Sequence, residues 1–431
     1  MMPLAIAFMF LVEVAVGLSP EAKESLTHAM PGFDLEALRE RLRRIGEHSL
    51  PAKIETAPES ADNSPTVDLD AGAAEKIEGS SDANNSTRRK RQWANFDNAR
   101  WPNNHLFYSF AASVTAKTKS IVKQSLAYLQ ARSCLTFTED ATATDRVEVF
   151  TGSGCYSSLG WMGGVQQLSL GKGCDVIGLA THEFIHALGS LHEHARYDRD
   201  DHITVDLTNV TPELQGQFGK SDNLETVNYT PYEYGSVMHY GASTFTSKGY
   251  SLKPKIGRYL QTEGSRYTTF YDLKMLNIYY KCPDVCGALG AAAATCKNGG
   301  FPNPKNCAVC VCPGGYGGAL CDQRPAGCGE TLVATAAWKT KTFTFGTPNN
   351  KALRDNFMLC NHWITDQPPR RSKFATNSIE PKYFADRAIT NPKICCPNLL
   401  NQIVTSALNP APIVSYNRVF TSTFTFQYRW V

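Results

Sequence analysis

Residues 181–200 read THEFIHALGSLHEHARYDRD and carry the most specific pattern in the chain. The run before Gly189 predicts a helix, on which residues four apart share one face, so His182 and His186 point the same way. A glycine can adopt the left-handed conformation that ends a helix, so the chain can turn at Gly189 and bring His192 back. The spacing therefore predicts that three imidazoles meet at one point.

Three histidines at this spacing indicate a zinc site with one coordination position left open, as in catalytic rather than structural zinc. Glu183 lies beside the histidine face, where it can act as a general base. A histidine pair alone fits two surface residues better than a metal site, whereas the full pattern from His182 to His192 is specific. The residues therefore favour hydrolysis by metal-activated water without a covalent intermediate.

Length and composition limit the number of domains and the class of protein. The 431 residues exceed what one compact core needs and suffice for two to four domains. The formal charge of +3 argues against a nucleic-acid binder, and the 42% apolar content argues against wholesale disorder. All 14 cysteines lie at or beyond Cys134, which is typical of a disulfide framework formed in an oxidising compartment.

The N-terminal residues predict export. An apolar run over residues 3–18 ends in the small-x-small pattern Ala15-Val16-Gly17, although it lacks a basic start and contains Glu13. We expect a signal peptide over residues 1–17; a buried helix is the alternative. No later stretch offers the ~20 apolar residues of a membrane span. We therefore expect a secreted, extracellular protein that does not insert into a membrane.

Residues 18–91 contain neither Cys nor Trp and end in four consecutive cations, RRKR, the last of which is Arg91. Cations in a flexible, Pro- and Ser-rich run suit the acidic cleft of a convertase-type protease, while a solvated charge run is the alternative. We interpret residues 18–91 as a propeptide that is removed by cleavage after Arg91.

The remaining chain falls into three parts. Residues 101–282 alternate strand-like and helical runs, which predicts an α+β domain. The expected strands cover residues 106–110, 146–150 and 165–170, and the expected helices cover 118–131 and 176–188. Residues 283–322 are rich in Gly and Cys, with almost no helical or strand periodicity, so disulfides must hold them. Residues 328–431 return to a β-like pattern.

The histidine stretch resembles the astacin family of metzincin zinc proteases. Its extension over residues 193–200, EHARYDRD, distinguishes astacins from other metzincins, and residues 236–240, SVMHY, resemble the family's Met-turn. Residues 153–160 and 163–174 resemble its β-strand region. The resemblance covers residues 92–282 and implies the α+β fold of a metzincin catalytic domain.

The resemblance also implies individual roles. Glu183 would be the general base and then the proton donor to the leaving amine. Tyr240 would be an additional, displaceable zinc ligand that swings to stabilise the oxyanion. Met238 would form the apolar floor under the metal, although core packing alone explains a buried methionine. One Zn²⁺ would be bound by His182, His186 and His192.

The resemblance to astacins also implies how the substrate binds and how the enzyme is activated. The strand over residues 165–170 would pair with an extended polypeptide substrate in antiparallel fashion. Arg266 would favour acidic residues just after the scissile bond, or be a surface arginine. The new N-terminus of an astacin inserts and pairs with the residue equivalent to Glu193. Cleavage after Arg91 leaves Gln92, which can cyclise and lose its charge, so burial of the segment can persist without that ion pair.

The cysteine order resembles that of nematode astacins with an EGF-like module (283–322) and a CUB-like β-sandwich domain (328–431). The EGF-like module is expected to be structural rather than calcium-binding. The implied disulfides are Cys134–Cys282, Cys155–Cys174, Cys286–Cys307, Cys296–Cys310, Cys312–Cys321 and Cys328–Cys360. Cys395 and Cys396 lack the usual partners, which leaves a strained vicinal bridge, free thiols or an intermolecular bond open.

These modules indicate extracellular matrix or cell-surface proteins as partners, besides the substrate and the activating protease. Asn209 and Asn228 begin glycosylation sequons. The alternative function is a catalytically silent matrix-binding protein that keeps the fold. Loss of Glu183 or of a zinc histidine would favour that alternative, and all of these residues are present.

Overall fold

The computed structural model describes residues 93–94, 99–221, 226–348, 354–365, 370–374, 378–395 and 403–430. The expected signal peptide (1–17), the expected propeptide (18–91) with its cleavage site at Arg91, and Cys396 lie outside these residues. Among the residues that are described, no helix is long and apolar enough to cross a membrane.

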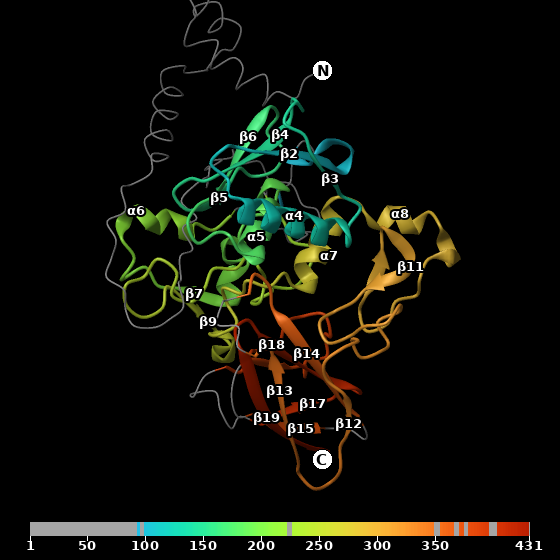
Figure 1. Ribbon diagram of the computed structural model, residues 1–431. Coiled ribbons are helices and arrows are strands. Elements are labelled where there is room, and N and C mark those ends of the chain that lie inside the picture. Colours follow the sequence, from blue (N-terminus) through green and yellow to red (C-terminus); the bar gives the residue numbers. More distant parts are fainter. Residues whose placement is uncertain are drawn as a thin grey trace, which may run out of the picture. The chain divides into compact units, whose positions relative to one another are not determined.

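A five-stranded sheet with two helices forms the first part of the chain (Figure 1). The strand order is β3-β2-β4-β6-β5, in which every pairing is parallel except that of β5 with β6. The bounds are β2 His105–Phe110, β3 Thr136–Glu139, β4 Arg146–Phe150, β5 Cys155–Ser157, β6 Val165–Leu170, α4 Ala116–Gln130 and α5 Ile177–Ala187. The elements expected from the sequence are present; β4 and β6 have the expected bounds, and the ends of the others are shifted by at most two residues.

The sheet corrects one expectation about substrate binding. β6 is an interior strand, because β4 pairs along one side of it and β5 pairs with Leu168–Leu170 on the other. The short antiparallel strand β5 occupies the edge of the sheet instead. The expectation that the strand over residues 165–170 pairs with the substrate is therefore wrong for residues 168–170, because strand order, which one strand's sequence does not encode, decides which edge is open.

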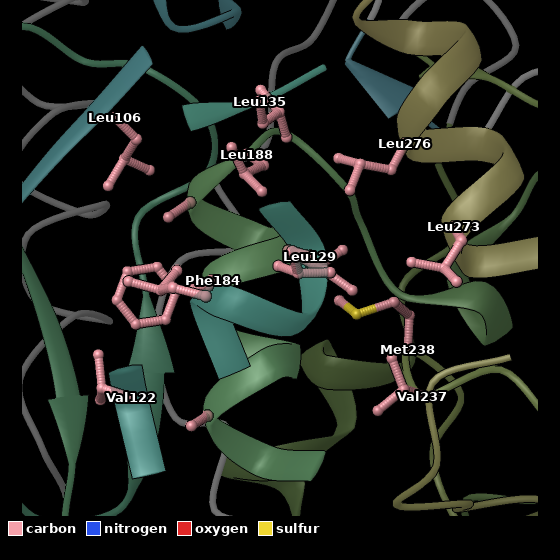
Figure 2. Packing of buried hydrophobic residues seen from close by; sticks show 14 of the residues in the cluster. Leu106, Val122, Leu129, Leu135, Phe184, Leu188, Val237, Met238, Leu273 and Leu276 are labelled. Atoms are coloured by element: carbon pink, nitrogen blue, oxygen red, sulfur yellow. The ribbon is translucent and has the colours of Figure 1, made fainter. Parts of the chain in front are cut away.

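The core of this part is made where α4, α5 and α7 meet the sheet. Figure 2 shows side chains from the three helices gathered around Leu129 of α4, with Phe184 and Leu188 contributed by α5 and the residue that follows it. Leu129, Phe184 and Leu188 are fully buried. Thr115 caps α4 by accepting a hydrogen bond from the backbone N–H of Thr118, which fixes the start of the helix.

Most of the other elements up to residue 292 are short. β7 pairs antiparallel with β9, β1 pairs antiparallel with β8, and α7 begins with a capping box formed by Thr269 and Asp272. Their bounds are β1 Trp93–Ala94, β7 Ile203–Val205, α6 Pro212–Gln215, β8 Thr226–Val227, β9 Leu252–Pro254 and α7 Phe270–Tyr279. The 3₁₀ turns are η2 Pro102–Asn104, η3 Glu193–Ala195, η4 Arg199–Asp201, η5 Gly216–Phe218, η6 Gly257–Tyr259 and η7 Gly290–Ala292.

The Cys-rich segment contains more regular structure than its periodicity predicts. Helix α8 (Pro283–Gly287) opens it, and β10 (Phe301–Asn303) pairs antiparallel with β11 (Asn306–Val311). Three disulfides lie within the segment and join residues 9 to 21 positions apart. Covalent closure of short loops stabilises elements that are too small to form a core of their own.

The C-terminal part consists of two four-stranded sheets, in the orders β12-β14-β18-β16 and β13-β19-β15-β17. Apolar side chains of both sheets form one buried cluster, to which Cys360 and Ile413 contribute from the first sheet and Phe424 and Phe426 from the second. We call this part the β-sandwich. Its strands are β12 Thr331–Val333, β13 Lys339–Gly346, β14 Met358–Thr365, β15 Arg370–Phe374, β16 Ile379–Pro381, β17 Ile403–Ser406, β18 Ala411–Asn417 and β19 Thr421–Trp430.

The disulfides follow the pattern that the resemblance implies. The structure joins Cys134–Cys282, Cys155–Cys174, Cys286–Cys307, Cys296–Cys310, Cys312–Cys321 and Cys328–Cys360. Cys395 is also disulfide-bonded. The described part of the chain therefore holds no free thiol.

Leu129→Ala tests the helical core. Removing a fully buried leucine leaves a cavity, so we expect the free energy of unfolding to fall by about 2–5 kcal/mol. Urea unfolding of the full chain, followed by tryptophan fluorescence, measures the change. Leu289→Ala is the matched control, because Leu289 is 53% exposed and should shift the transition very little. Equal shifts in the two variants would contradict this account of the core.

Glu263 gives stability a pH dependence. It is 8% exposed, neither carboxylate oxygen has a hydrogen-bond partner among the described residues, and burial raises its pKa to about 8. The folded chain therefore keeps a proton that the unfolded chain releases near pH 4.5. Between these pH values the free energy of unfolding should fall as pH rises, by up to about 1.4 kcal/mol per pH unit.

Glu263→Gln removes this titration, so urea unfolding between pH 5 and 8 should be less pH-dependent in the variant than in the wild type. The exposed Glu213 supplies the control variant Glu213→Gln. The same pH slope in wild type and Glu263→Gln would show that the buried carboxyl does not hold its proton.

Candidate active site

Helix α5 and the turn after it bring the three histidines together. His182 and His186 lie on one face of the helix, and Gly189 follows with φ +105°, where a side chain would be strained and would meet the ring of Tyr279. The Nε2 atom of His186 lies 3.0 Å from Nε2 of His182 and 3.1 Å from Nε2 of His192. The three side chains are therefore positioned to hold one metal ion.

The opposite ring nitrogens of two histidines are already engaged. Nδ1 of His182 lies 2.6 Å from the carbonyl oxygen of Val237, and Nδ1 of His186 lies 2.6 Å from that of Ser190. A carbonyl can only accept, so each Nδ1 carries the proton and each Nε2 presents its lone pair to the shared point. This tautomer is the one that a divalent metal requires, and three imidazoles suit Zn²⁺.

A pocket opens beside the histidines. Glu183, which is 1% exposed, and Tyr240 line it together with His182. Cys155 of the edge strand β5 and Arg266 also contribute to the lining. The pocket thus joins the sheet edge, the helix and the loop that contains Arg266.

Tyr240 is held between aromatic rings. Its ring stacks on His194 with centroids 4.0 Å apart, and it lies 4.4 Å from the ring of His192. His194 is fully buried, and its Nε2 lies 3.1 Å from the carbonyl oxygen of Gln217. The tyrosine therefore stands next to a metal-binding histidine with its ring orientation restricted. The sequence analysis did not single out His194, although it belongs to the same motif.

The turn that contains Met238 is held by the carboxylate of Asp272, which the sequence analysis did not identify. Asp272 of α7 accepts hydrogen bonds from the Ser236 hydroxyl and from the Val237 backbone N–H. The carbonyl oxygen of Met238 in turn accepts from the backbone N–H of Glu193. Asp272 occupies the third position of the capping box at Thr269, and this Thr-x-x-Asp pattern is the signal that could have identified it.

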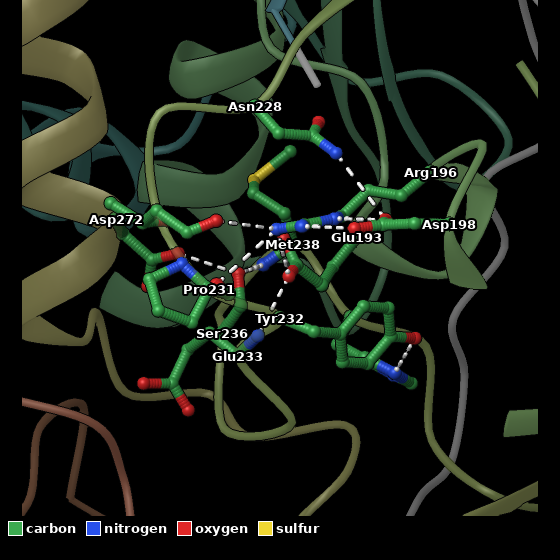
Figure 3. A network of polar contacts seen from close by, with 12 residues as sticks. Glu193, Arg196, Asp198, Asn228, Pro231, Tyr232, Glu233, Ser236, Met238 and Asp272 are labelled. Atoms are coloured by element: carbon green, nitrogen blue, oxygen red, sulfur yellow. Dashed lines mark hydrogen bonds and ion pairs between the residues drawn. The ribbon is translucent and has the colours of Figure 1, made fainter. Parts of the chain in front are cut away.

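Glu193 belongs to a buried polar network (Figure 3). Its Oε1 atom accepts from the Arg196 guanidinium at 3.0 Å and from the Glu233 backbone N–H at 2.7 Å. Arg196 also forms a bidentate ion pair with Asp198, in which its Nε lies 2.9 Å from Oδ1 and its Nη2 lies 2.8 Å from Oδ2. The other oxygen of Glu193 has no hydrogen-bond partner among the described residues. Burial raises the pKa of Glu193 to about 7, against the opposing effects of Arg196 and the Glu233 N–H.

The two sequons have different surroundings. Asn209 is exposed. Asn228 is only 8% exposed, and its amide nitrogen donates to Asp198 at 3.3 Å, within the network of Figure 3. A glycan needs an exposed amide, so the expectation for Asn228 does not fit the folded chain, in which its side chain supports the ion pair of Asp198.

Comparisons with known proteins agree with this geometry. The family model of astacin, which describes a family of peptidases, matches residues 94–281. Zinc metalloproteinase nas-32 of Caenorhabditis elegans is 41% identical over 372 residues, which are 82% of this chain and 56% of that protein. Nas-25 of the same organism is 37% identical over 357 residues, which are 77% of this chain and 88% of that protein.

Among solved structures, high choriolytic enzyme 1, a hatching enzyme zinc-protease from Oryzias latipes, is 29% identical, with a TM-score of 0.39. The match covers 44% of this chain and 94% of that one. This chain spans little more than half the length of nas-32 and nas-31. Because the similarity to nas-25 extends over most of both proteins, the chain belongs to the astacin family of zinc metalloproteinases.

Proposed function

We propose that this chain is a secreted zinc endopeptidase that hydrolyses peptide bonds in extracellular proteins and is made as a zymogen. The observation that carries the proposal is the convergence of three Nε2 atoms beside a pocket that Glu183 and Tyr240 also line. His182, His186 and His192 would hold one Zn²⁺. When bound, the ion would polarise the scissile carbonyl and lower the pKa of a water to about 7.

The side chains supply the proton transfers and the charge stabilisation. Glu183, buried at the pocket, takes a proton as general base and returns it to the leaving amine. The Tyr240 hydroxyl donates a hydrogen bond to the developing oxyanion, and the stacked ring of His194 limits the directions it can point. Met238, which is 1% exposed, forms the apolar floor.

The substrate is an extended polypeptide that adds to the edge of the sheet at β5. Cys155 of this strand lines the pocket, and the free edge supplies backbone hydrogen bonds of the β-augmentation type. Arg266 lines the same pocket, which supports a preference for an acidic side chain just after the scissile bond.

Activation follows cleavage after Arg91 by a convertase-type protease. Strand β1 begins one residue beyond Gln92 and pairs with β8, next to Asn228 of the buried network. This pairing and the unpartnered oxygen of Glu193 support insertion of the new N-terminal segment toward Glu193. Residues 283–322 would be an EGF-like module and residues 328–431 a CUB-like domain, which would contact matrix or cell-surface proteins. Asn209 would be glycosylated.

Glu183→Gln tests the general base. Replacing the carboxylate with an amide removes the proton acceptor but not the metal ligands, so kcat should fall on the order of 10²–10⁴-fold. Casein cleavage by the chain processed at Arg91 measures the rate, and Glu213→Gln is the matched control. Metal analysis should find one zinc per chain in both variants, and a chelator should abolish wild-type cleavage. A zinc-loaded, processed wild type without activity would contradict the proposal and favour the matrix-binding alternative.

Arg266→Ala tests substrate preference. We expect cleavage-site mapping on a peptide library to lose its bias toward Asp and Glu after the scissile bond, by about tenfold relative to neutral residues. The exposed Arg258 supplies the control variant Arg258→Ala. An unchanged bias in Arg266→Ala would place the determinant of selectivity elsewhere.

A further inference from the structure

A loop of the β-sandwich packs against the residues that frame the active site. It covers residues 382–394, after strand β16, and we call it the 382–394 loop. The Thr390 backbone N–H donates to Glu233 Oε2 at 2.9 Å, and the Thr390 carbonyl oxygen accepts from the Tyr259 hydroxyl at 2.9 Å. Thr390 is 7% exposed and Glu233 is fully buried, so these hydrogen bonds are shielded from water.

Glu233 connects this loop to the buried polar network that contains Glu193. One of its carboxylate oxygens accepts from Thr390, the other accepts from the Gly235 backbone N–H at 2.9 Å, and its own backbone N–H donates to Glu193. Gly235 directly precedes the turn that contains Met238. A shift of the 382–394 loop would therefore remove one of the two hydrogen-bond donors of a buried carboxylate whose backbone is bonded to Glu193, the residue that follows His192.

The packing at Gly235 leaves no room for a side chain. A Cβ atom at this position would lie 2.7 Å from the Thr390 Cγ2 atom and 2.8 Å from its Cβ atom. The main chain that enters the Met238 turn therefore rests directly on Thr390. Contact of this closeness couples the position of one segment to that of the other.

The same loop also supports the wall of the pocket. The Lys393 backbone N–H donates to the Thr262 hydroxyl at 2.9 Å, and Lys393 Nζ donates to the Ser265 hydroxyl at 3.0 Å. Ser265 lines the pocket beside Arg266. Lys393 is 9% exposed, and its ammonium also lies 4.8 Å from the centre of the Tyr416 ring. The β-sandwich thus holds the segment that presents Arg266.

The 382–394 loop is itself held firmly. Lys382 forms a buried ion pair with Glu380 at 2.8 Å and donates to the Ile389 carbonyl oxygen. Asn391 donates its backbone N–H to Glu380, and its side-chain oxygen accepts from the backbone N–H of Tyr383. The loop therefore contacts Glu233, Gly235 and Ser265 in a conformation that its own hydrogen bonds already fix.

We propose that the β-sandwich is a positioning element of the active site, in which Thr390 sets the Met238 turn and Lys393 sets the pocket wall at Ser265. This inference rests on the proposed peptidase function. It makes Thr390 and Lys393 positioning residues, because they act through Glu233, Gly235 and Ser265 rather than on the substrate. It also gives the β-sandwich a role in the reaction beyond the recognition of partners.

A compensating pair of substitutions tests the contact at Thr390. In the full, processed chain, Gly235→Ala should clash with Thr390 and lower kcat/KM on the order of 10- to 100-fold. Adding Thr390→Gly removes the clashing atoms, so the double variant should recover to within about threefold of Thr390→Gly alone. Gly257→Ala is the matched control, because nothing lies within 4 Å of a Cβ atom there. A double variant no better than Gly235→Ala would overturn the proposal at Thr390.

A second variant keeps the proposal testable even where Gly235→Ala fails to fold. Lys393→Met retains the length of the side chain but not the hydrogen bond to Ser265. We expect a changed residue preference after the scissile bond, and hydrogen exchange in residues 259–266 faster by about tenfold. The exposed Lys339 supplies the control variant Lys339→Met. Wild-type cleavage preference and exchange in Lys393→Met would overturn the role of the pocket wall.

The exchange measurement needs no enzymatic activity. An inactive wild type would therefore count against the proposed peptidase function alone. Faster exchange in Lys393→Met would still support the positioning contact, and unchanged exchange would still refute it.

Discussion

Three imidazole rings can share one metal only if the helix that carries two of them stops at the right residue. Helix α5 ends after Ala187, and Gly189 adopts φ +105° before the chain returns to His192. Another residue there would be strained and would meet the ring of Tyr279. The rest of the active site is arranged around this turn: the sheet edge, the Met238 turn and the pocket wall all approach the point that the turn creates.

Buried carboxylates hold the backbone and the charged side chain that lie next to the metal-binding histidines. Asp272 of α7 holds the Met238 turn, whereas Asp198 and Glu193, which are close to Arg196 in sequence, flank its buried guanidinium. Buried charges are tolerated because each has a partner. One oxygen of Glu193, in contrast, has no hydrogen-bond partner among the described residues.

The β-sandwich also supplies hydrogen bonds to residues next to the active site. The Glu233 carboxylate accepts a hydrogen bond from the Thr390 backbone N–H, while the Glu233 backbone N–H donates to Glu193. A domain more than a hundred residues away in sequence therefore completes the hydrogen bonding of residues next to the active site. Buried contacts join the β-sandwich to Gly235, which precedes the Met238 turn, and to Ser265 of the pocket wall.

The sequence by itself determined the features that depend on local spacing. It predicted α5, β4 and β6 to within a residue or two and the meeting of the three histidines, because helical and strand periodicity act over short distances. The disulfide pairing came from the resemblance to astacins. It did not predict that β5 forms the sheet edge, that Asn228 is buried against Asp198, or that Asp272, Glu233 and Thr390 support the site. Those features depend on strand order and on contacts between distant segments, and only the packing of the whole chain decides which distant groups share one buried space.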